Sequence, residues 1–427
     1  MSIRSLVAVV TMLIARLAMA QNTVLPPPTG PREIARVTYA WRDSSRAAFL
    51  DEGAAGRREV VVDVWYPSRS TASRARAPYL ADIASLRRLM PDSVLRRRFD
   101  PSYALVASGR LTTHAADGGP VACRTHGCPL IVFSHGGGVD RASYTAQYED
   151  LASHGYIVAA IAHPYDTHIV VLPSDRLVTA RPQPPDTVEP NKALPAWRQE
   201  LAREARSQAY LRRVLAAEAA DVRFVVDELL RMARDGASPF AGTIDGRIGA
   251  AGHSAGGEAA ALACQLDARI KACLNQDGAI HGLPFPRDGA GRTMSQPFLY
   301  FTRLIPRPKA PNEALATMQI TRRELDSVND DVTAGPVRLL NDLPAGGYRL
   351  LLNVPGMNHL SFSDEPLLRA VGDPVNSAHQ LVALALVRKY TLAFFDKTLL
   401  GQADTPLERV VPADTALLRI ERYPPRP

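Results

Sequence analysis

The segment Gly252-His253-Ser254-Ala255-Gly256-Gly257 constrains the fold of this chain more than any other stretch. It matches G-x-S-x-G, the sharp turn between a strand and a helix that lifts a serine hydroxyl out of a parallel sheet. An apolar strand at 247–251 precedes it and a helix-forming segment at 258–265 follows it, which is the context that the motif requires. Glycines two residues to either side of Ser254 are expected because the strained turn leaves no room for a β-carbon there. A Gly- and Ser-rich structural turn is the alternative interpretation.

From residue 129 onward, continuous apolar strands alternate with helices. Strands that are apolar on both faces indicate a mostly parallel sheet that is covered by helices on both sides, which is the α/β class. The predicted strands are 59–66, 130–134, 156–162, 247–251, 270–275, 297–301 and 348–354, and the predicted helices are 142–153, 197–234, part of 312–346, and 379–400. Together with the elbow, this pattern predicts the α/β-hydrolase fold.

We divide the chain into four parts. Residues 1–20 are a predicted signal peptide, 21–58 an N-terminal linker and extension, 59–401 the hydrolase domain, and 402–427 a C-terminal tail. Insertions are expected near 166–240 and 312–346, where the connections are longer than such crossovers need. The arginine-rich stretch 70–110 is expected to form short helices.

The first twenty residues have the three parts of a secretory signal. Arg4 supplies the positive start, residues 6–15 form the apolar core, and Ala18-Met19-Ala20 is a small-x-small cleavage site. The core is shorter than the roughly 20 apolar residues that span a bilayer. We therefore expect a secreted or periplasmic protein that is cleaved after Ala20, with a retained N-terminal anchor helix as the alternative.

Four cysteines fit an oxidising compartment, in which they allow three complete pairings. A Cys123–Cys128 bridge would close a short loop, and a Cys264–Cys273 bridge would tie a helix to the next strand. Free buried thiols at 264 and 273 are equally compatible with the sequence. The spacing does not match a zinc site, so we expect no metal and no organic cofactor.

The net charge of +7 comes mostly from arginines that are spread along the chain. No basic block alternates with aromatic residues, so nucleic acid is not an expected partner. The positive charge is compatible with a weak attraction to anionic surfaces.

A base must remove the proton of Ser254 for its hydroxyl to attack, and a third group must orient that base. In α/β-hydrolases these groups follow in the order Ser, acid, His, each on a loop after a strand. His359 follows the strand at 348–354 and precedes the last helix, so we predict it to be the base. The alternative is His379, which lies in that helix.

Asp277 is the predicted acid because it directly follows the strand at 270–275. The alternatives are an ordinary turn aspartate at 277 and an acid after the strand at 297–301. The first acid in that second loop is Glu313, which is distant and is expected to lie in the next helix.

An oxyanion hole needs two backbone N–H donors where negative charge develops. We predict the amides of Ala255, directly after the nucleophile, and Gly137, in the glycine-rich segment 134–138. A simple tight turn is the alternative for these glycines. His135 and His253 are expected to be structural residues rather than reacting groups.

Several segments of the chain resemble the platelet-activating factor acetylhydrolase family and its bacterial members. The most specific are Ile131 to Gly138 (IVFSHGGG), Asp150 to Ala160 (DLASHGYIVAA) and Gly252 to Gly257; Asp63 to Pro67, Asp221 to Asp227 and Tyr390 to Asp396 are also similar. The resemblance extends over residues 59–401. It implies a serine esterase that removes short or oxidised acyl groups from phospholipid-like esters through an acyl-enzyme. It also implies an acid at Asp277, a Gly-x-x-His loop at 356–359, and an oxyanion donor at Gly137.

Two positions depart from that family. Ala255 stands where the family often has Phe, and Gly137 stands where it often has Leu, so we expect a wider pocket beside the oxyanion hole. The segments 166–191 and 312–346 are expected to border the cleft as lids. The expected partners are a small or lipid ester and a membrane surface.

Three other functions compete with this interpretation. The first is a general carboxylesterase or a polyester (cutinase-like) hydrolase. The second is a serine peptidase of the prolyl-oligopeptidase type, although the chain has no blade-like repeat. The third is a non-catalytic binding module on the same fold.

Overall fold

The computed structural model describes residues 25–48, 56–69, 71–99, 111–123, 126–180, 196–280, 294–304, 321–370, 373–409 and 411–425. The predicted signal peptide therefore lies outside the described residues. No helix within the described ranges is long and apolar enough to cross a lipid bilayer.

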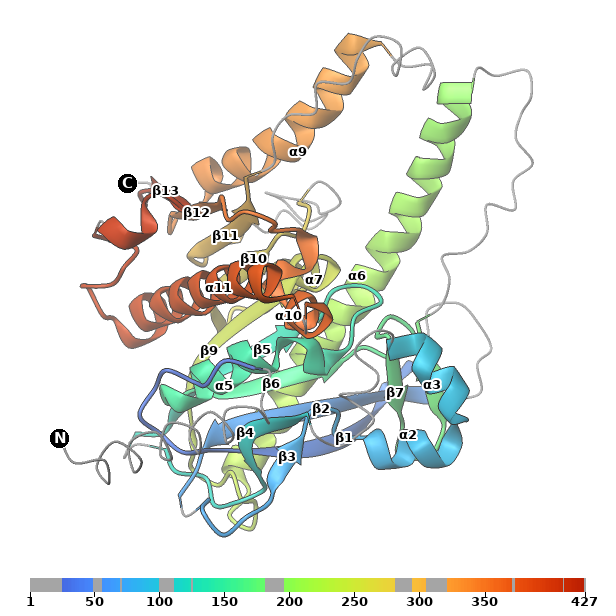
Figure 1. The fold of residues 1–427 in the computed structure, drawn as a ribbon, viewed down its shortest axis with the longest axis vertical. Helices are drawn as coiled ribbons and strands as arrows, with labels where there is room; N and C mark the ends of the chain where they lie inside the picture. Colours follow the sequence, from blue (N-terminus) through green and yellow to red (C-terminus); the bar gives the residue numbers. More distant parts are fainter. Residues whose placement is uncertain are drawn as a thin grey trace, which may run out of the picture.

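An eleven-stranded sheet forms the centre of the molecule (Figure 1). Its parallel middle runs in the order β12 (Gly347–Leu352), β11 (Phe298–Arg303), β10 (Ile270–Gln276), β9 (Ile244–His253), β5 (Cys128–Ser134) and β6 (Ile157–Ala162). One side continues through β2 (Arg57–Pro67), β1 (Ile34–Ala47), β4 (Thr112–Asp117) and β3 (Arg76–Pro78), and β13 (Leu418–Tyr423) closes the other side antiparallel to β12. The predicted mostly parallel sheet is thus confirmed.

Helices cover both faces of this sheet. On one face α6 (Ala196–Arg234), α7 (Ala255–Leu266) and α9 (Arg322–Asp342) pack through residues such as Val222, Ala260 and Leu340. On the other face α5 (Thr145–Ser153) and α11 (Pro374–Leu400) pack through Tyr148 and Phe394. Figure 1 shows that α6 and α9 also extend well beyond the edge of the sheet.

The predicted helices occur with small shifts of their ends. The stretch 197–234 lies within α6 and 379–400 lies within α11, while 142–153 divides into a 3-10 turn, Arg141–Tyr144, and α5. The arginine-rich stretch contains α2 (Ile83–Leu89) and α3 (Asp92–Phe99).

Two parts that the sequence analysis set outside the domain belong to the sheet. The predicted linker and extension, 21–58, contains β1, which pairs antiparallel with β2 from Ile34 opposite Pro67 to Asp43 opposite Arg58. The predicted tail, 402–427, contains β13, which pairs with β12. From Val37 to Arg42 in β1, partly buried side chains alternate with exposed ones, and β13 has a single buried residue, Leu418, which is typical of strands with one partly solvated face.

The predicted lid segments are described in part. The stretch 166–191 begins with a hairpin of β7 (Ile169–Val171) and β8 (Leu177–Thr179), and 312–346 contains α9. Residues 181–195 and 305–320 lie outside the described ranges.

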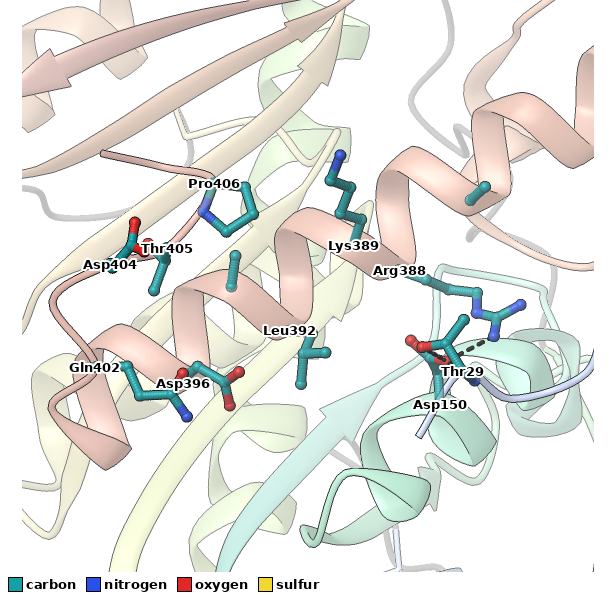
Figure 2. Close-up of a pocket in the computed structure, with 12 residues that line it drawn as sticks. Thr29, Asp150, Arg388, Lys389, Leu392, Asp396, Gln402, Asp404, Thr405 and Pro406 are labelled. Atoms are coloured by element: carbon teal, nitrogen blue, oxygen red, sulfur yellow. Dashed lines mark hydrogen bonds and ion pairs between the residues drawn. The ribbon is translucent and has the colours of Figure 1, made fainter. Parts of the chain in front are cut away.

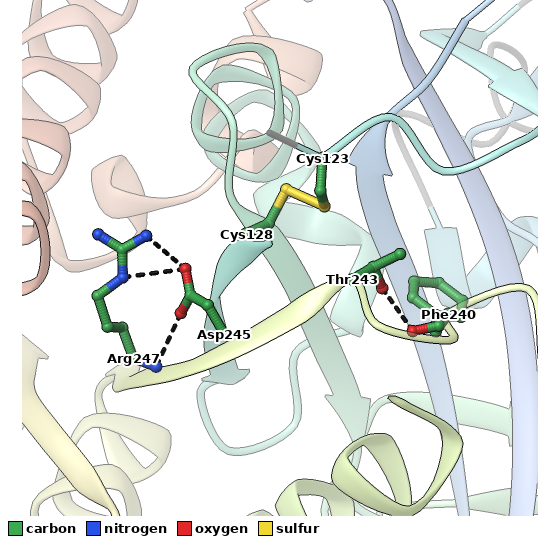
Figure 3. The surroundings of a disulfide bond; sticks show 6 residues. All are labelled: Cys123, Cys128, Phe240, Thr243, Asp245 and Arg247. Atoms are coloured by element: carbon green, nitrogen blue, oxygen red, sulfur yellow. Dashed lines mark hydrogen bonds and ion pairs between the residues drawn. A yellow bond between two sulfur atoms is a disulfide. The ribbon is translucent and has the colours of Figure 1, made fainter. Parts of the chain in front are cut away.

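All four cysteines are paired. Cys123–Cys128 fastens the segment before β5 to the start of that strand, and Figure 3 shows it near the start of β9, in which Arg247 pairs with Asp245. Cys264–Cys273 joins α7 to β10. The pairings that the sequence analysis considered therefore occur, and the alternative of free thiols is wrong.

Candidate active site

Ser254 occupies a strained turn between β9 and α7. Its backbone has φ 54° and ψ −126°, a conformation that residues with a side chain rarely adopt. A β-carbon on Gly252 would lie 2.3 Å from the carbonyl oxygen of Gly256, and one on Gly256 would lie 2.2 Å from that of His135. Because neither contact is sterically possible, the turn requires both glycines, as the motif predicts.

The three predicted side chains meet at the carboxyl ends of the parallel strands. The Oγ of Ser254 lies 2.9 Å from Nε2 of His359, and Nδ1 of His359 lies 2.7 Å from Oδ2 of Asp277. Both distances are within the range expected between a nucleophile, its base and an orienting acid. His379 lies in α11, and Glu313 is outside the described residues.

The loop that carries Asp277 is fixed by hydrogen bonds from both neighbouring strands. The N–H of Ser254 donates to the carbonyl of Gln276 at 2.8 Å, and the N–H of Asp277 donates to that of Phe301 at 2.7 Å. Asp277 itself has φ 54°. Ser254 and Asp277 are therefore held at adjacent strand ends by backbone hydrogen bonds of the sheet.

The carboxylate of Asp277 accepts more than the bond from His359. Oγ1 of Thr302 donates to it at 2.5 Å and Nε of Arg303 donates at 2.8 Å. Burial raises the pKa of Asp277, but the bonds from His359, Thr302 and Arg303 outweigh burial and lower this pKa below its ordinary value. The acid is therefore ionised at neutral pH. The sequence analysis missed Thr302 and Arg303, which are the last two residues of β11 and which it treated as part of a loop examined only for a competing acid.

The loop that carries His359 is also held in place. Gly356 has φ 71°, and the side chain of Asn358 caps the 3-10 turn His359–Phe362. From α11, Nε2 of Gln380 donates to the carbonyl of Gly356 at 3.2 Å, and Oγ of Ser361 donates to Oε1 of Gln380 at 2.9 Å. The imidazole is thus presented by an ordered loop.

Two backbone amides are available beside Ser254. In the glycine-rich loop, the N–H of Gly136 donates to Oη of Tyr144 at 3.0 Å, and the N–H of Gly138 donates to the carbonyl of Asp166 at 2.8 Å. The amides of Gly137 and Ala255 have no acceptor among the hydrogen bonds of the described residues. A β-carbon built on Gly137 would lie 3.9 Å from Cβ of Ala255, so these two residues are neighbours. The segment also forms a tight turn, since the N–H of Val139 donates to the carbonyl of Gly136.

His135 holds the glycine-rich loop in place through two hydrogen bonds of its ring. Its Nδ1 donates to the carbonyl of Gly136 at 2.8 Å, and its Nε2 accepts from the N–H of His163 at 3.1 Å. Burial, reinforced by the nearby His163, lowers the pKa of His135 to about 4, so the ring is neutral. It is a structural hydrogen-bonding residue, as the sequence analysis expected.

Glu258, one helical turn after Ser254, makes the free energy of unfolding depend on pH. The side chain is buried, and burial raises its pKa to about 8 although the N–H of Ala279 donates to it. Because the folded state holds the proton more tightly, the contribution of this group to stability is full below pH 4.5 and is lost as the pH rises through 8. Relative to wild type, Glu258→Gln should gain up to about 4 kcal/mol of unfolding free energy between pH 5 and pH 9. Urea unfolding at both pH values measures this gain, and an equal difference at both would contradict it.

The described residues contain no group of three or more His, Cys, Asp or Glu side chains that is arranged to hold a metal ion. A separate pocket of about 360 Å³ lies along α11, between α5 and the segment 402–406 (Figure 2). Of its charged groups, Arg388 pairs with Asp150 at 2.6 Å, whereas Lys389 pairs with Asp414 and Asp404 pairs with Arg409, outside the lining. None of the three predicted catalytic residues lines it.

The parallel sheet, its two helical layers and the serine elbow define an α/β-hydrolase. Within this class, residues 52–399 match the family model described as platelet-activating factor acetylhydrolase, isoform II. This match covers most of the chain, so the chain belongs to that family.

Several proteins of known name or structure are similar to this chain. A probable 1-alkyl-2-acetylglycerophosphocholine esterase of Arthroderma benhamiae is 32% identical over 174 residues, which are 41% of this chain and 37% of that protein. The platelet-activating factor acetylhydrolase of Canis lupus familiaris is 69% identical over 35 residues, 8% of each chain. The alignments with these relatives thus span much less than two thirds of their length. A solved ferulic acid esterase from Streptomyces cinnamoneus superposes with a TM-score of 0.63 and 26% identity, covering 94% of this chain and 98% of that structure.

Proposed function

We propose that this protein is a serine carboxylic ester hydrolase that acts through an acyl-enzyme. The observation that carries the proposal is the continuous hydrogen-bonded series Ser254, His359 and Asp277 beside two backbone amides without acceptors. Ser254 is half-exposed and Gly137 is exposed, so a substrate carbonyl can reach both. Esterase names among the relatives and the solved structure agree with this chemistry.

In the acylation step, Oγ of Ser254 attacks the ester carbonyl while Nε2 of His359 takes the hydroxyl proton. The negative charge that develops on the carbonyl oxygen is stabilised by the N–H groups of Gly137 and Ala255. Ala255 is also the first residue of α7, where the unpaired amides of the helix favour an anion. His359 then gives the proton to the leaving alcohol. In deacylation, His359 takes a proton from the attacking water and returns it to Oγ of Ser254 as the acid product leaves.

Asp277 keeps the imidazole in the tautomer that this cycle needs. Its ionised carboxylate accepts from Nδ1 of His359, which leaves Nε2 free to accept the proton of Ser254. Thr302 donates to Oδ1 of the carboxylate and Arg303 donates to Oδ2, the oxygen that His359 also binds, so both hold the carboxylate that orients the His359 ring.

We infer a phospholipid-like ester with a short or oxidised acyl chain as the substrate. Family membership and the name of the fungal relative support this class. Gly137 and Ala255 add space beside the oxyanion amides: the nearest atoms to a β-carbon on Gly137 would be the carboxylate of Asp166 at 3.7 Å and Cβ of Ala255 at 3.9 Å, which are ordinary van der Waals contacts. The family's bulkier side chains would fill this space, so we expect acyl groups longer than acetyl to be accepted.

A hydrolysis panel of phospholipids that differ only in the sn-2 acyl length tests this inference. Wild type should cleave the acetyl and the longer members with similar kcat/KM. Gly137→Ala should lower kcat/KM for the longer members about 10-fold more than for the acetyl member, because the pocket narrows at the oxyanion amide. In the control Gly335→Ala, the added β-carbon meets no atom within 4 Å, so the profile should stay unchanged. Equal losses over the whole panel in Gly137→Ala would contradict the pocket assignment.

A general carboxylesterase is the second candidate. The ferulic acid esterase covers nearly the whole chain, whereas the curated relatives align over segments, and this favours a broader range of esters. Turnover of nitrophenyl esters, feruloyl esters and polyester film without turnover of any phospholipid would support this candidate over the first.

We further propose that the chain is exported and processed after Ala20. The signal-like residues 1–20 and the two disulfides support an oxidising destination. N-terminal sequencing of the exported protein should begin at Gln21, and retention in the cytoplasm would contradict the proposal.

A further inference from the structure

Two fully buried side chains lie between the oxyanion loop and the loop of His359. Tyr144 ends the 3-10 turn before α5, and His253 is the last residue of β9, directly before Ser254. Neither has a part in the reaction steps above. The elements that carry them are 109 residues apart in the chain.

These side chains form a continuous series of hydrogen bonds. The N–H of Gly136 lies 3.0 Å from Oη of Tyr144, which lies 2.9 Å from Nδ1 of His253. On the other side of the ring, Nε2 of His253 lies 2.9 Å from the backbone carbonyl of His359.

The donor and the acceptor of each hydrogen bond in the series follow from the groups at its two ends. The carbonyl of His359 can only accept, so Nε2 of His253 carries a hydrogen and donates it. In a neutral ring Nδ1 then accepts from the hydroxyl of Tyr144, whose oxygen accepts from the N–H of Gly136. Burial, followed by the neighbouring His359, lowers the pKa of His253 to about 3, which keeps the ring neutral.

The packing leaves these groups little freedom to move. The ring of His253 lies 4.6 Å from that of His359 and 5.7 Å from that of Phe362. A β-carbon on Gly136 would lie 3.0 Å from Nδ1 of His253 and 3.3 Å from Oη of Tyr144. Gly136 therefore has to be glycine for the loop to approach the pair, in contrast to Gly137, whose β-carbon position is open.

We propose that Tyr144 and His253 are positioning residues that couple the oxyanion loop to the loop of the catalytic histidine. The proposal rests on the proposed hydrolase function of the site. By binding the N–H of Gly136, Tyr144 fixes the peptide between His135 and Gly136, next to the peptide that carries the Gly137 amide, and leaves that amide for the substrate. By binding the carbonyl of His359, His253 fixes the backbone whose side chain reaches Ser254. The oxyanion loop and the loop of His359 are thus held at a fixed position relative to each other.

Tyr144→Phe removes one oxygen from the series and is the main test. Its activity should be compared with that of Tyr148→Phe. Tyr148 is a buried tyrosine one turn along the same face, and its hydroxyl has no hydrogen-bond partner within the described part of the chain. On a nitrophenyl ester, we expect Tyr144→Phe to lose about 10- to 100-fold in kcat with little change in KM, because the reacting groups are misplaced while binding is kept. Tyr148→Phe should keep wild-type kcat.

A second readout does not depend on the natural substrate. A fluorophosphonate forms a bond from phosphorus to Oγ of Ser254, fluoride leaves, and His359 receives the serine proton. The labelling rate should fall in Tyr144→Phe by a factor similar to the fall in kcat. If wild type is labelled but cleaves no phospholipid, the substrate inference fails and the coupling is still measured; if wild type is not labelled, the hydrolase function fails.

A double variant tests whether the two residues act as one unit. Gln at position 253 keeps a donor for the carbonyl of His359 but breaks the link to Tyr144. We therefore expect Tyr144→Phe combined with His253→Gln to be no slower than His253→Gln alone. Should Tyr144→Phe fail to fold, as judged by its melting temperature, the labelling rate of His253→Gln against Tyr148→Phe tests the same link. A rate loss in the double variant equal to the product of the two single losses would overturn the proposal. Equal rates for Tyr144→Phe and Tyr148→Phe would overturn it as well.

Discussion

Replacing Ser254 with alanine is expected to lower kcat by at least about 10⁴-fold, because the variant has no nucleophile to form an acyl-enzyme. The remaining rate would come from substrate binding and from the amides of Gly137 and Ala255, which the substitution leaves in place. Steady-state kinetics on a nitrophenyl ester measure the loss, and labelling by a fluorophosphonate should disappear with it.

The matched control for this variant is Ser174→Ala, in the exposed turn between β7 and β8. It should keep wild-type turnover and labelling. Retention of more than a few per cent of activity in Ser254→Ala would assign the chemistry to another group and remove the basis of the proposed function.

Asp277→Asn is expected to lower kcat by about 10³- to 10⁴-fold while leaving the fold intact. The amide nitrogen of Asn cannot accept from Nδ1 of His359, and its oxygen is neutral, so the imidazole loses the tautomer and the stabilisation that it needs. Arg303 would also lose its charged partner. Kinetics from pH 5 to pH 10 measure the effect, and raising the pH should not restore the rate.

Asp404→Asn is a suitable control because its carboxylate is 77% exposed on a surface loop. It should behave as wild type. A drop of less than 10-fold in Asp277→Asn would mean that the His359 loop and Gln380 orient the imidazole without the acid.

The central sheet and the convergence of Ser254, Asp277 and His359 were predictable because their signals are local. Each middle strand is a short apolar run; Ser254 and Asp277 each directly follow one, and His359 lies in the loop after another. Parallel strands end at the same edge, so residues after different strands were expected to meet there. The structure brings these three side chains within hydrogen-bonding distance of one another.

The edge strands were harder to predict for a physical reason. In β1, Val37, Tyr39 and Trp41 alternate with polar or small residues, and in β13 Leu418 and Ile420 alternate with charged ones. This alternation is typical of a strand with one solvated face. Because the predicted strands rest on continuous apolar runs, which are typical of buried strands, they do not include β1 and β13.

The residues that orient the site have no local signature at all. Thr302 and Arg303 reach Asp277 from a neighbouring strand, and Tyr144 reaches His253 from a turn more than a hundred residues away. Such contacts depend on strand order and side-chain rotamers. A single sequence specifies neither in a form that can be read directly.

The Cys264–Cys273 bridge connects the helix that follows Ser254 to the strand that precedes Asp277. A loop of this size stabilises a fold by about 2–3 kcal/mol in the chain-entropy view, and here the cross-linked elements are the supports of Ser254 and Asp277. Where the protein is made therefore bears on how well its site is assembled. Synthesis in a reducing cytoplasm would yield a chain with the right residues but without the covalent tie between them, whereas passage through an oxidising compartment would complete the enzyme as it folds.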